Sequence, residues 1–147
     1  MVKLAVSNLT RANLGFLLAK ASQHWNELLY ANFSQKGFAH VRPSFGSVLI
    51  PLFEEDGLRV GELGRRARLS KQTMTTLVRL VEKAGLVKRE ADPDDNRAAR
   101  IYLTAEARRF GPAAEKVLAQ LERQAEQVGG KERLNEVRRW LSWFAHL

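Results

Sequence analysis

The sequence has no cysteine. A chain without cysteine cannot contain a disulfide framework, a zinc–thiolate site or a thiol redox sensor. This composition is consistent with the reducing environment of the cytoplasm, where we expect the protein to act. The sequence also lacks any apolar run near the roughly 20 residues of a membrane-spanning helix, and its N-terminus is too polar for a signal peptide. We therefore expect no membrane association.

Motifs for metal binding and catalysis are missing as well. The three histidines, His24, His40 and His146, do not show the spacing of metal ligands. No nucleophile lies in a motif with a histidine and a carboxylate, and no glycine-rich phosphate loop occurs. The sequence thus predicts neither an enzyme nor a protein that needs a metal or another cofactor.

The chain carries an excess of positive charge that is concentrated in one segment. Its formal net charge is +8. Residues 58–104 hold 11 Lys and Arg against 6 Asp and Glu, whereas residues 1–57 hold 5 against 4 and residues 105–147 hold 8 against 6. A local excess of this kind is expected of a surface that binds a polyanion such as nucleic acid.

One helix is predicted at the centre of this basic segment. Ser70 is a good N-cap, and Gly85 lies where a glycine ends a helix. A helical repeat of apolar residues forms the buried face, at Met74, Leu77, Val78 and Val81. The other face mixes bases with uncharged hydrogen-bonding side chains, which suits the major groove of DNA; its residues are Ser70, Lys71, Gln72, Thr73, Thr75, Thr76 and Arg79. The alternative is an ordinary amphipathic helix with a polar solvent face.

The flanks of this helix predict a winged helix-turn-helix. A short helix over residues 60–67 and a tight turn precede it. Strands at residues 86–91 and 99–103, joined by turn formers at residues 92–96, follow it as a β-hairpin wing. Arg97 lies at the tip, where a guanidinium can enter a minor groove. Asp95 is placed to pair with Arg97 or with the hairpin backbone; the alternative for the tip is a solvated acidic turn.

Four further helices flank this unit. We expect the first at residues 8–35, capped by Ser7, Asn8 or Thr10. We expect the second to begin at Pro43 or Ser44 and to be kinked by Pro51 or broken near Ile50. The expected buried residues of the second helix are Val48, Leu49, Leu52 and Phe53. The last two helices occupy residues 104–128 and 131–147, and Trp140, Trp143 and Phe144 on the final helix favour a dimer interface.

The hairpin carries the most specific motif. Asp95, Arg97, Ile101, Leu103 and Thr104 fit the pattern D-x-R-x-x-x-φ-x-L-T, where φ is apolar. With the run over residues 62–89, this pattern resembles the MarR family of bacterial transcription regulators across about residues 43–104. The resemblance implies a homodimer that binds a pseudo-palindromic DNA duplex near promoters, usually as a repressor. By position, residues 70–76 and Arg79 would contact the major groove, and Arg97, held by Asp95, the minor groove.

These observations predict a mainly α-helical protein with a small β-hairpin wing. Residues 43–104 form the winged helix-turn-helix domain, and residues 1–36 and 105–147 form a helical dimerisation region. Two other functions remain open at this point. One is an architectural nucleic-acid-binding protein with little sequence specificity, and the other is a winged helix that binds proteins and not DNA.

The resemblance also implies a small-molecule effector between the dimerisation helices and the winged domain. An aromatic wall beside an arginine or a histidine suits an aromatic or phenolic acid. The candidates by position are His24, Trp25, Arg42, Ser44 and Phe45. The alternative is that Trp25 and Phe45 belong to the core, and that His24 and Arg42 are solvated or bonded to the backbone.

Overall fold

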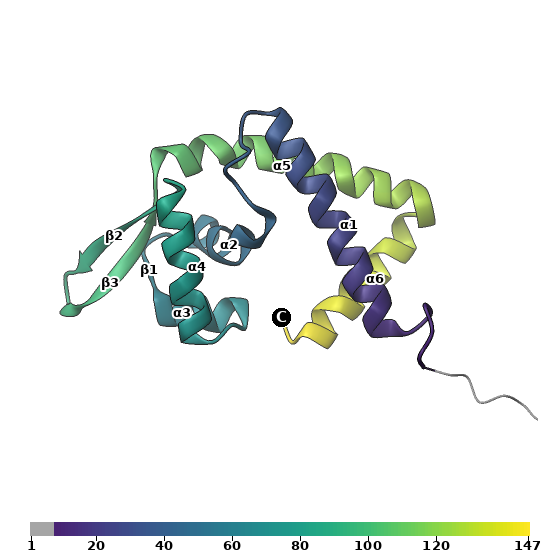
Figure 1. Ribbon diagram of the computed structural model, residues 1–147, viewed down its shortest axis with the longest axis horizontal. Helices are drawn as coiled ribbons and strands as arrows, with labels where there is room; N and C mark the ends of the chain where they lie inside the picture. Colours follow the sequence, from purple (N-terminus) through teal and green to yellow (C-terminus); the bar gives the residue numbers. More distant parts are fainter. Residues whose placement is uncertain (1–7) are drawn as a thin grey trace, which may run out of the picture.

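The fold is mainly helical with a three-stranded antiparallel wing (Figure 1). The computed structural model describes residues 8–147. In chain order, the first elements are α1 (Leu14–Gln35), a 3₁₀ turn η1 (Pro43–Phe45), α2 (Gly46–Glu54), β1 (Leu58–Arg59), α3 (Val60–Ala67) and α4 (Lys71–Lys83). The remaining elements are β2 (Val87–Asp92), β3 (Asp95–Leu103), α5 (Ala105–Gly129) and α6 (Lys131–Ala145).

Helix α1 begins at Leu14, later than we expected. Asn13, and neither Asn8 nor Thr10, is its N-cap, because the Asn13 side chain accepts a hydrogen bond from the Phe16 backbone N–H. The same side chain donates to the Asn8 carbonyl and so fixes the preceding bend. Ser7, the third proposed cap, and the rest of residues 1–7 lie outside the described part of the chain.

Of the kink or break expected near Pro51, the break is wrong, because α2 continues through this residue to Glu54. Val48, Leu49 and Leu52 are at most 3% exposed, so buried packing on both sides of the proline holds the helix. The Glu55 N–H also bonds to the Pro51 carbonyl and continues the backbone ladder. The prediction that Phe53 is buried is wrong as well, since 44% of it is exposed.

Helices α3 and α4 form the predicted helix-turn-helix. Leu63, Met74, Val78 and Val81 are fully buried between them and the rest of the core. Gly64 allows the close approach, because a Cβ there would lie 3.0 Å from the Leu69 carbonyl oxygen. Helix α3 ends through Arg68 in the left-handed conformation, and Ser70 caps α4 by accepting from the Thr73 N–H.

The wing contains one strand more than the sequence predicted. Strand β1 pairs with β3 through Leu58↔Ile101 and Arg59↔Arg100, so the sheet order is β1-β3-β2. The hairpin turn is also shorter than residues 92–96, because Asp92 already pairs with Asp95. The two residues of β1 carry no readable periodicity, which is why this strand was not predicted.

Helix α5 connects the winged domain to the terminal helices. The Thr104 hydroxyl donates to the Gly85 carbonyl and accepts from the Ala107 N–H, so it caps α5 and ties it to the end of α4. Phe110 of α5 packs edge-on against Phe33 and Phe38, with ring centroids 4.9 and 5.2 Å apart. These contacts fix α1 and α5 to each other at one end.

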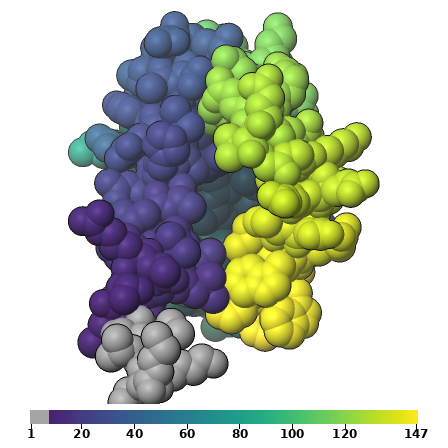
Figure 2. Space-filling view, turned by 90° about the vertical axis from the view of Figure 1, so that its right-hand side faces the viewer, coloured from purple at the N-terminus to yellow at the C-terminus, as the bar shows by residue number. Residues whose placement is uncertain are grey.

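The opposite end of the molecule exposes apolar side chains on α1 and α6. Figure 2 shows α1 on one side and α5 followed by α6 on the other, with a hollowed strip between the two sides. Leu14 and Leu17 are each 50% exposed, Trp143 is 72% exposed and Phe144 is 53% exposed. No helix within residues 8–147 has the length and apolar character to cross a membrane.

Candidate nucleic-acid interface

The outward face of α4 presents the side chains that we predicted for DNA contact. Lys71, Gln72, Thr73, Thr76 and Arg79 are exposed, and Thr75 is half-buried. The Thr75 and Thr76 hydroxyls donate to the carbonyls of Lys71 and Gln72 in their own helix. Their oxygens therefore present acceptor lone pairs and their methyl groups an apolar surface.

Ser70 is the N-cap of α4, and its hydroxyl both donates and accepts a hydrogen bond. This hydroxyl donates to the Thr73 Oγ1 at 2.9 Å and accepts from the Thr73 N–H at 3.1 Å. The donors that remain on this face belong to the Thr73 hydroxyl, the Gln72 amide and the two bases, Lys71 and Arg79. In the described part of the chain, neither base makes an ion pair.

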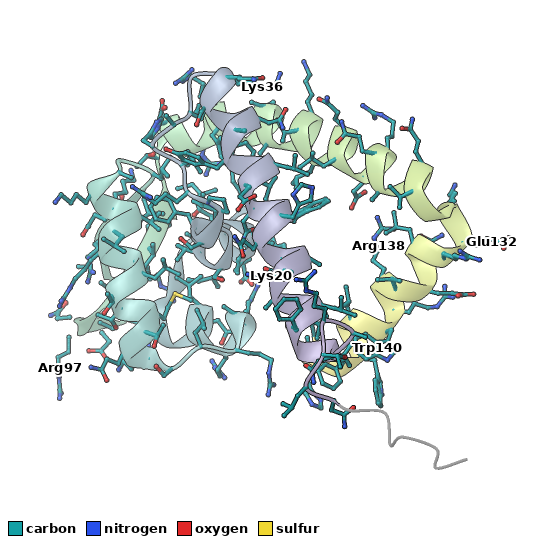
Figure 3. All side chains as sticks on the ribbon, turned by 45° about the vertical axis from the view of Figure 1, so that its right-hand side comes forward. Lys20, Lys36, Arg97, Glu132, Arg138 and Trp140 are labelled. Atoms are coloured by element: carbon teal, nitrogen blue, oxygen red, sulfur yellow. The ribbon has the colours of Figure 1, made fainter. Side chains whose placement is uncertain are left out.

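Arg97 lies at the tip of the wing, directed away from the body of the protein (Figure 3). Residues 96–98 fall between the Ala91↔Ala99 and Asp92↔Asp95 pairs, so Arg97 is on an irregular part of β3. The Asp95 carboxylate accepts from the Arg97 backbone N–H at 3.0 Å. Of the two partners predicted for Asp95, the structure therefore shows the hairpin backbone. Within residues 8–147 the Arg97 guanidinium makes no ion pair.

A hollow of about 700 Å³ lies between α3, α4 and the wing, and we call it the basic hollow. Three predicted residues line it, namely Lys71, Thr75 and Arg97. It also contains bases that the sequence analysis did not select: Arg59, Arg65, Arg89 and Arg100. The positive side chains of the basic hollow can bind the phosphates of a nucleic-acid backbone.

All four of these additional bases are already paired within the protein. Arg65 bonds Glu62, and Arg89 lies 3.3 Å from the Glu82 carboxylate. Arg59 and Arg100 both bond Asp92. In the region that the structure describes, Lys71 and Arg97 are the cations of the basic hollow that have no ion-pair partner.

Asp92 anchors the wing from inside. Only 1% of this residue is exposed. Its Oδ2 accepts from the Nε of Arg59 at 2.6 Å and of Arg100 at 3.1 Å, while its Oδ1 accepts from the Asp94 N–H at 2.9 Å. The Asp94 N–H and the Arg59 guanidinium hold the pKa of the Asp92 carboxyl below its ordinary value. Because Arg59 and Arg100 are 33 and 8 residues away from Asp92 in sequence, no local pattern indicated this cluster.

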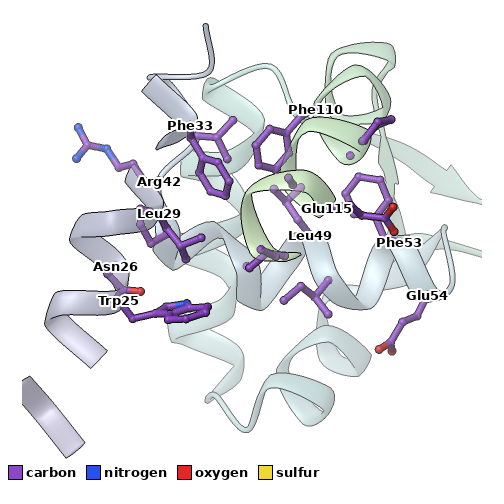
Figure 4. Close-up of a pocket in the computed structure, with 18 residues that line it drawn as sticks. Trp25, Asn26, Leu29, Phe33, Arg42, Leu49, Phe53, Glu54, Phe110 and Glu115 are labelled. Carbon is purple, nitrogen blue, oxygen red and sulfur yellow. The ribbon is translucent and has the colours of Figure 1, made fainter. Parts of the chain in front are cut away.

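A second, mostly apolar hollow of about 720 Å³ lies between α1, α2 and α5 (Figure 4), and we call it the apolar hollow. The rings of Trp25, Phe33, Phe53 and Phe110 contribute to its lining. Its charged lining residues are Arg42, Glu54 and Glu115. In Figure 4, Arg42 and Glu54 lie at opposite edges of this hollow.

The candidate effector residues are only partly brought together. Trp25 and Arg42 line the apolar hollow. His24 and Ser44 are exposed outside its lining, and Phe45 is buried in the core at 4% exposure. Other lining residues, such as Phe53, Glu54 and Glu115, were not candidates, because their positions depend on how α2 packs against α5. The described residues contain no group of three side chains suited to a metal ion.

The fold and this basic face define a winged helix-turn-helix protein with an exposed recognition helix. A model of the MarR family matches residues 43–99. The HTH-type transcriptional repressor Rv2887 of Mycobacterium tuberculosis is 33% identical over 107 residues, which are 73% of this chain and 75% of that protein. The chain belongs to the MarR family, a family of transcriptional regulators and not of enzymes.

Other comparisons agree with this assignment. The regulator TtmR of Methylorubrum extorquens is 43% identical over 61 residues, 42% of this chain and 31% of that protein, so the alignment spans less than a third of TtmR. The PcaV regulator of Streptomyces coelicolor, solved with its natural ligand, has the same fold. Its TM-score is 0.80 at 20% identity, with coverage of 97% of this chain and 96% of that chain.

Two further solved structures contain DNA or a small molecule. The repressor CouR, bound to a 23-mer DNA duplex, has a TM-score of 0.78 at 22% identity, covering 95% of this chain and 99% of that chain. Rv2887 of M. tuberculosis in complex with salicylic acid has a TM-score of 0.62 at 28% identity, covering 90% of this chain and 96% of that chain.

Replacing the buried carboxylate tests the anchor of the wing. We expect Asp92→Asn to lower the melting temperature at pH 7, because Arg59 and Arg100 lose their charged partner. The pKa of Asp92 is lower in the folded protein than in the unfolded chain. Its charge therefore contributes to the free energy of unfolding above the unfolded pKa of about 4, and this contribution is lost as the pH falls through the folded pKa. The difference in melting temperature between Asp92→Asn and the wild type should therefore become smaller below about pH 4. Thermal melts over a pH series measure this difference, and the same difference at all pH values would contradict this assignment.

Proposed function

We propose that the protein is a homodimeric, sequence-specific DNA-binding transcription regulator, acting in the cytoplasm as a repressor. The observation that carries this proposal is that two cations without an ion-pair partner in the described residues, Lys71 on α4 and Arg97 on the wing, line the basic hollow. Between them a phosphate backbone meets positive charge without displacing an internal ion pair. The DNA-bound state of CouR supports the same use of the fold.

The residues of α4 divide by chemistry into base contacts and phosphate contacts. The Gln72 amide has both a donor and an acceptor, which matches the N6 and N7 edge of adenine. The Thr73, Thr75 and Thr76 side chains offer acceptors and methyl groups to base edges. Lys71 and Arg79 neutralise phosphates or contact guanine, and Arg97 enters the minor groove while Asp95 holds its backbone.

Dimerisation is supported by the exposed apolar faces of α1 and α6. Burying side chains such as Trp143 and Phe144 against a second copy would remove them from water. A two-fold dimer presents two α4 helices to successive major grooves, about 34 Å apart, which requires a pseudo-palindromic operator. Residues 8–36 and 105–147 would thus set the half-site spacing.

The apolar hollow is the place we propose for a small aromatic or phenolic effector. Its aromatic lining suits a planar ring, and Arg42 at its edge can pair with a carboxylate. The complex of Rv2887 with salicylic acid supports this choice of ligand class. The ligand would release the operator by binding more tightly to a state whose α4 helices no longer match the two grooves.

One experiment separates this function from the architectural alternative. In a mobility shift on the promoter region of its own gene, at physiological salt, a sequence-specific regulator gives a discrete complex that resists random competitor DNA. If the competitor removes the complex, the protein binds DNA without specificity. If no duplex binds at all, the DNA-binding function is wrong.

Two substitutions distinguish the parts of the interface. We expect Arg97→Ala to weaken binding to all sequences, because the wing loses its free cation. We expect Gln72→Ala to reduce discrimination between the operator and single-base variants by about 1–3 kcal/mol, as for one base contact. Lys36→Ala, at the far end of α1 (Figure 3), is the control that removes one charge elsewhere. Fluorescence anisotropy titrations measure all three, and uniform weakening by Gln72→Ala would assign that side chain to phosphate.

The dimer interface is tested on α6. Leu141→Asp should raise the dimer dissociation constant by about 10-fold or more, since burial of a large apolar side chain contributes about 1.5–3 kcal/mol. Arg139→Gln on the same helix serves as the exposed control. Light scattering over a dilution series follows the mass, and an unaltered dimer in the Leu141 variant would exclude this face.

The effector site is tested by calorimetry with salicylate as the probe. We expect heat of binding to the wild type, a weaker signal with Trp25→Ala, and release of operator DNA by saturating salicylate. His24→Ala, just outside the apolar hollow, is the matched control and should behave as wild type. Absence of heat together with an unaffected DNA complex would count against an aromatic-acid effector.

A further inference from the structure

Arg68, in the turn between α3 and α4, has an unfavourable backbone conformation. Its φ and ψ of 55° and 41° lie in the left-handed region, which glycine or asparagine usually occupies at the end of a helix. Elsewhere in residues 8–147, His146 is the other non-glycine residue with positive φ. A side chain that keeps this conformation at a cost in stability is a reason to look for a function.

The backbone of the turn does not need an arginine. The Arg68 N–H bonds to the Arg65 carbonyl at 3.3 Å, and the Leu69 N–H bonds to the Gly64 carbonyl at 2.9 Å. Both bonds use main-chain groups that glycine also has. The identity of the side chain must therefore be explained by what it binds outside this turn.

The charge of Arg68 also has no internal use. The two other arginines of this helix region are paired, Arg65 with Glu62 and Arg66 with both Glu55 and Glu62. Arg68 is exposed and makes no ion pair in the described part of the chain. A cation near a helix C-terminus does interact favourably with the helix dipole, but Arg65 and Arg66 already occupy the last turn of α3.

Arg68 follows closely in sequence on a residue of the basic hollow. Arg65 lines this hollow, and Arg68 lies three residues later, directly after the last residue of α3. It also lies two residues before Ser70, the N-cap of α4. The free cations of this surface therefore continue from Arg97 and Lys71 to the point where α4 begins.

We infer that Arg68 binds a phosphate of the DNA backbone beside the major groove entered by α4. This inference rests on the proposed function and adds a contact to it. The guanidinium carries a permanent positive charge that can neutralise a phosphate and donate a charge-assisted hydrogen bond to its oxygens. The protein thus retains a less stable backbone in this turn because the side chain stabilises the DNA complex.

The inference predicts opposite effects on folding and on binding. Arg68→Gly should raise the melting temperature by about 2–4 °C, because glycine adopts the left-handed conformation without strain. The same variant should bind operator DNA about 10-fold more weakly, because one charge-assisted hydrogen bond is absent. The slope of log affinity against log salt should fall by about 0.9 for each phosphate that the variant no longer neutralises.

Three further variants make the test specific. Arg68→Asn tolerates the left-handed conformation without charge, so its affinity should fall as that of Arg68→Gly does, even though its turn is less flexible than with glycine. Arg68→Lys should retain most of the affinity and the salt slope. Lys36→Gln, which removes one exposed charge at the end of α1, should change neither the affinity nor the slope.

The outcomes separate this inference from the proposed function. If wild type binds the operator and Arg68→Gly binds with equal affinity and salt slope, the phosphate contact is wrong while the regulator remains. If Arg68→Lys binds as weakly as Arg68→Gly, a positive charge at this position is not what binds the DNA, and the inference fails. If wild type binds no duplex, the inference and the proposed function fail together.

Discussion

The ion-pair cluster of the buried Asp92 carboxylate is the interaction on which the geometry of the basic face depends. A buried charge is tolerated only when it is paired and hydrogen-bonded. Its partners belong to three different places: Arg59 at the junction of β1 and α3, Arg100 on β3, and the backbone of the hairpin turn. The wing is therefore held at a fixed angle to α3, and α3 in turn packs on α4.

This arrangement gives the arginines of one surface two distinct uses. Arg59 and Arg100 are paired with Asp92, and Arg100 also donates to the Gly57 carbonyl at 3.1 Å. Lys71 and Arg97 make no ion pair within residues 8–147, and they lie where the anchor positions them. The net charge of the segment is thus a poor guide to the charge that is available to a ligand, because a large share of it is already neutralised internally.

The elements that the sequence predicted correctly are those whose signals are local. Ser70 and Thr104 cap their helices through side chains that reach three residues along the chain. The apolar repeat of α4 identified its buried face for the same reason. The assignment to the MarR family agrees with the wing motif, which also lies within ten consecutive residues.

The features that sequence reasoning missed depend on contacts between distant segments. Strand β1 exists because β3 offers it partners, and Asp92 is buried because Arg59 arrives from another element. Pro51 was expected to interrupt α2, but burial of its neighbours outweighs the missing backbone bond. The lining of the apolar hollow, including Phe53 and Glu115, follows from the packing of α2 against α5.

The length of helix α5 determines how far a movement at one of its ends displaces the other end. Its 25 residues form one continuous helix about 37 Å long, with Pro112 inside it. One end is tied to α4 through Thr104, and the other is joined to α6, where Arg138 pairs with Glu122. A tilt of about 5° at the fixed end moves the other end by about 3 Å over that length. A small molecule packed against Phe110 would therefore act near the fixed end of α5, and a modest displacement there would become larger at α6, the helix that we propose for dimerisation.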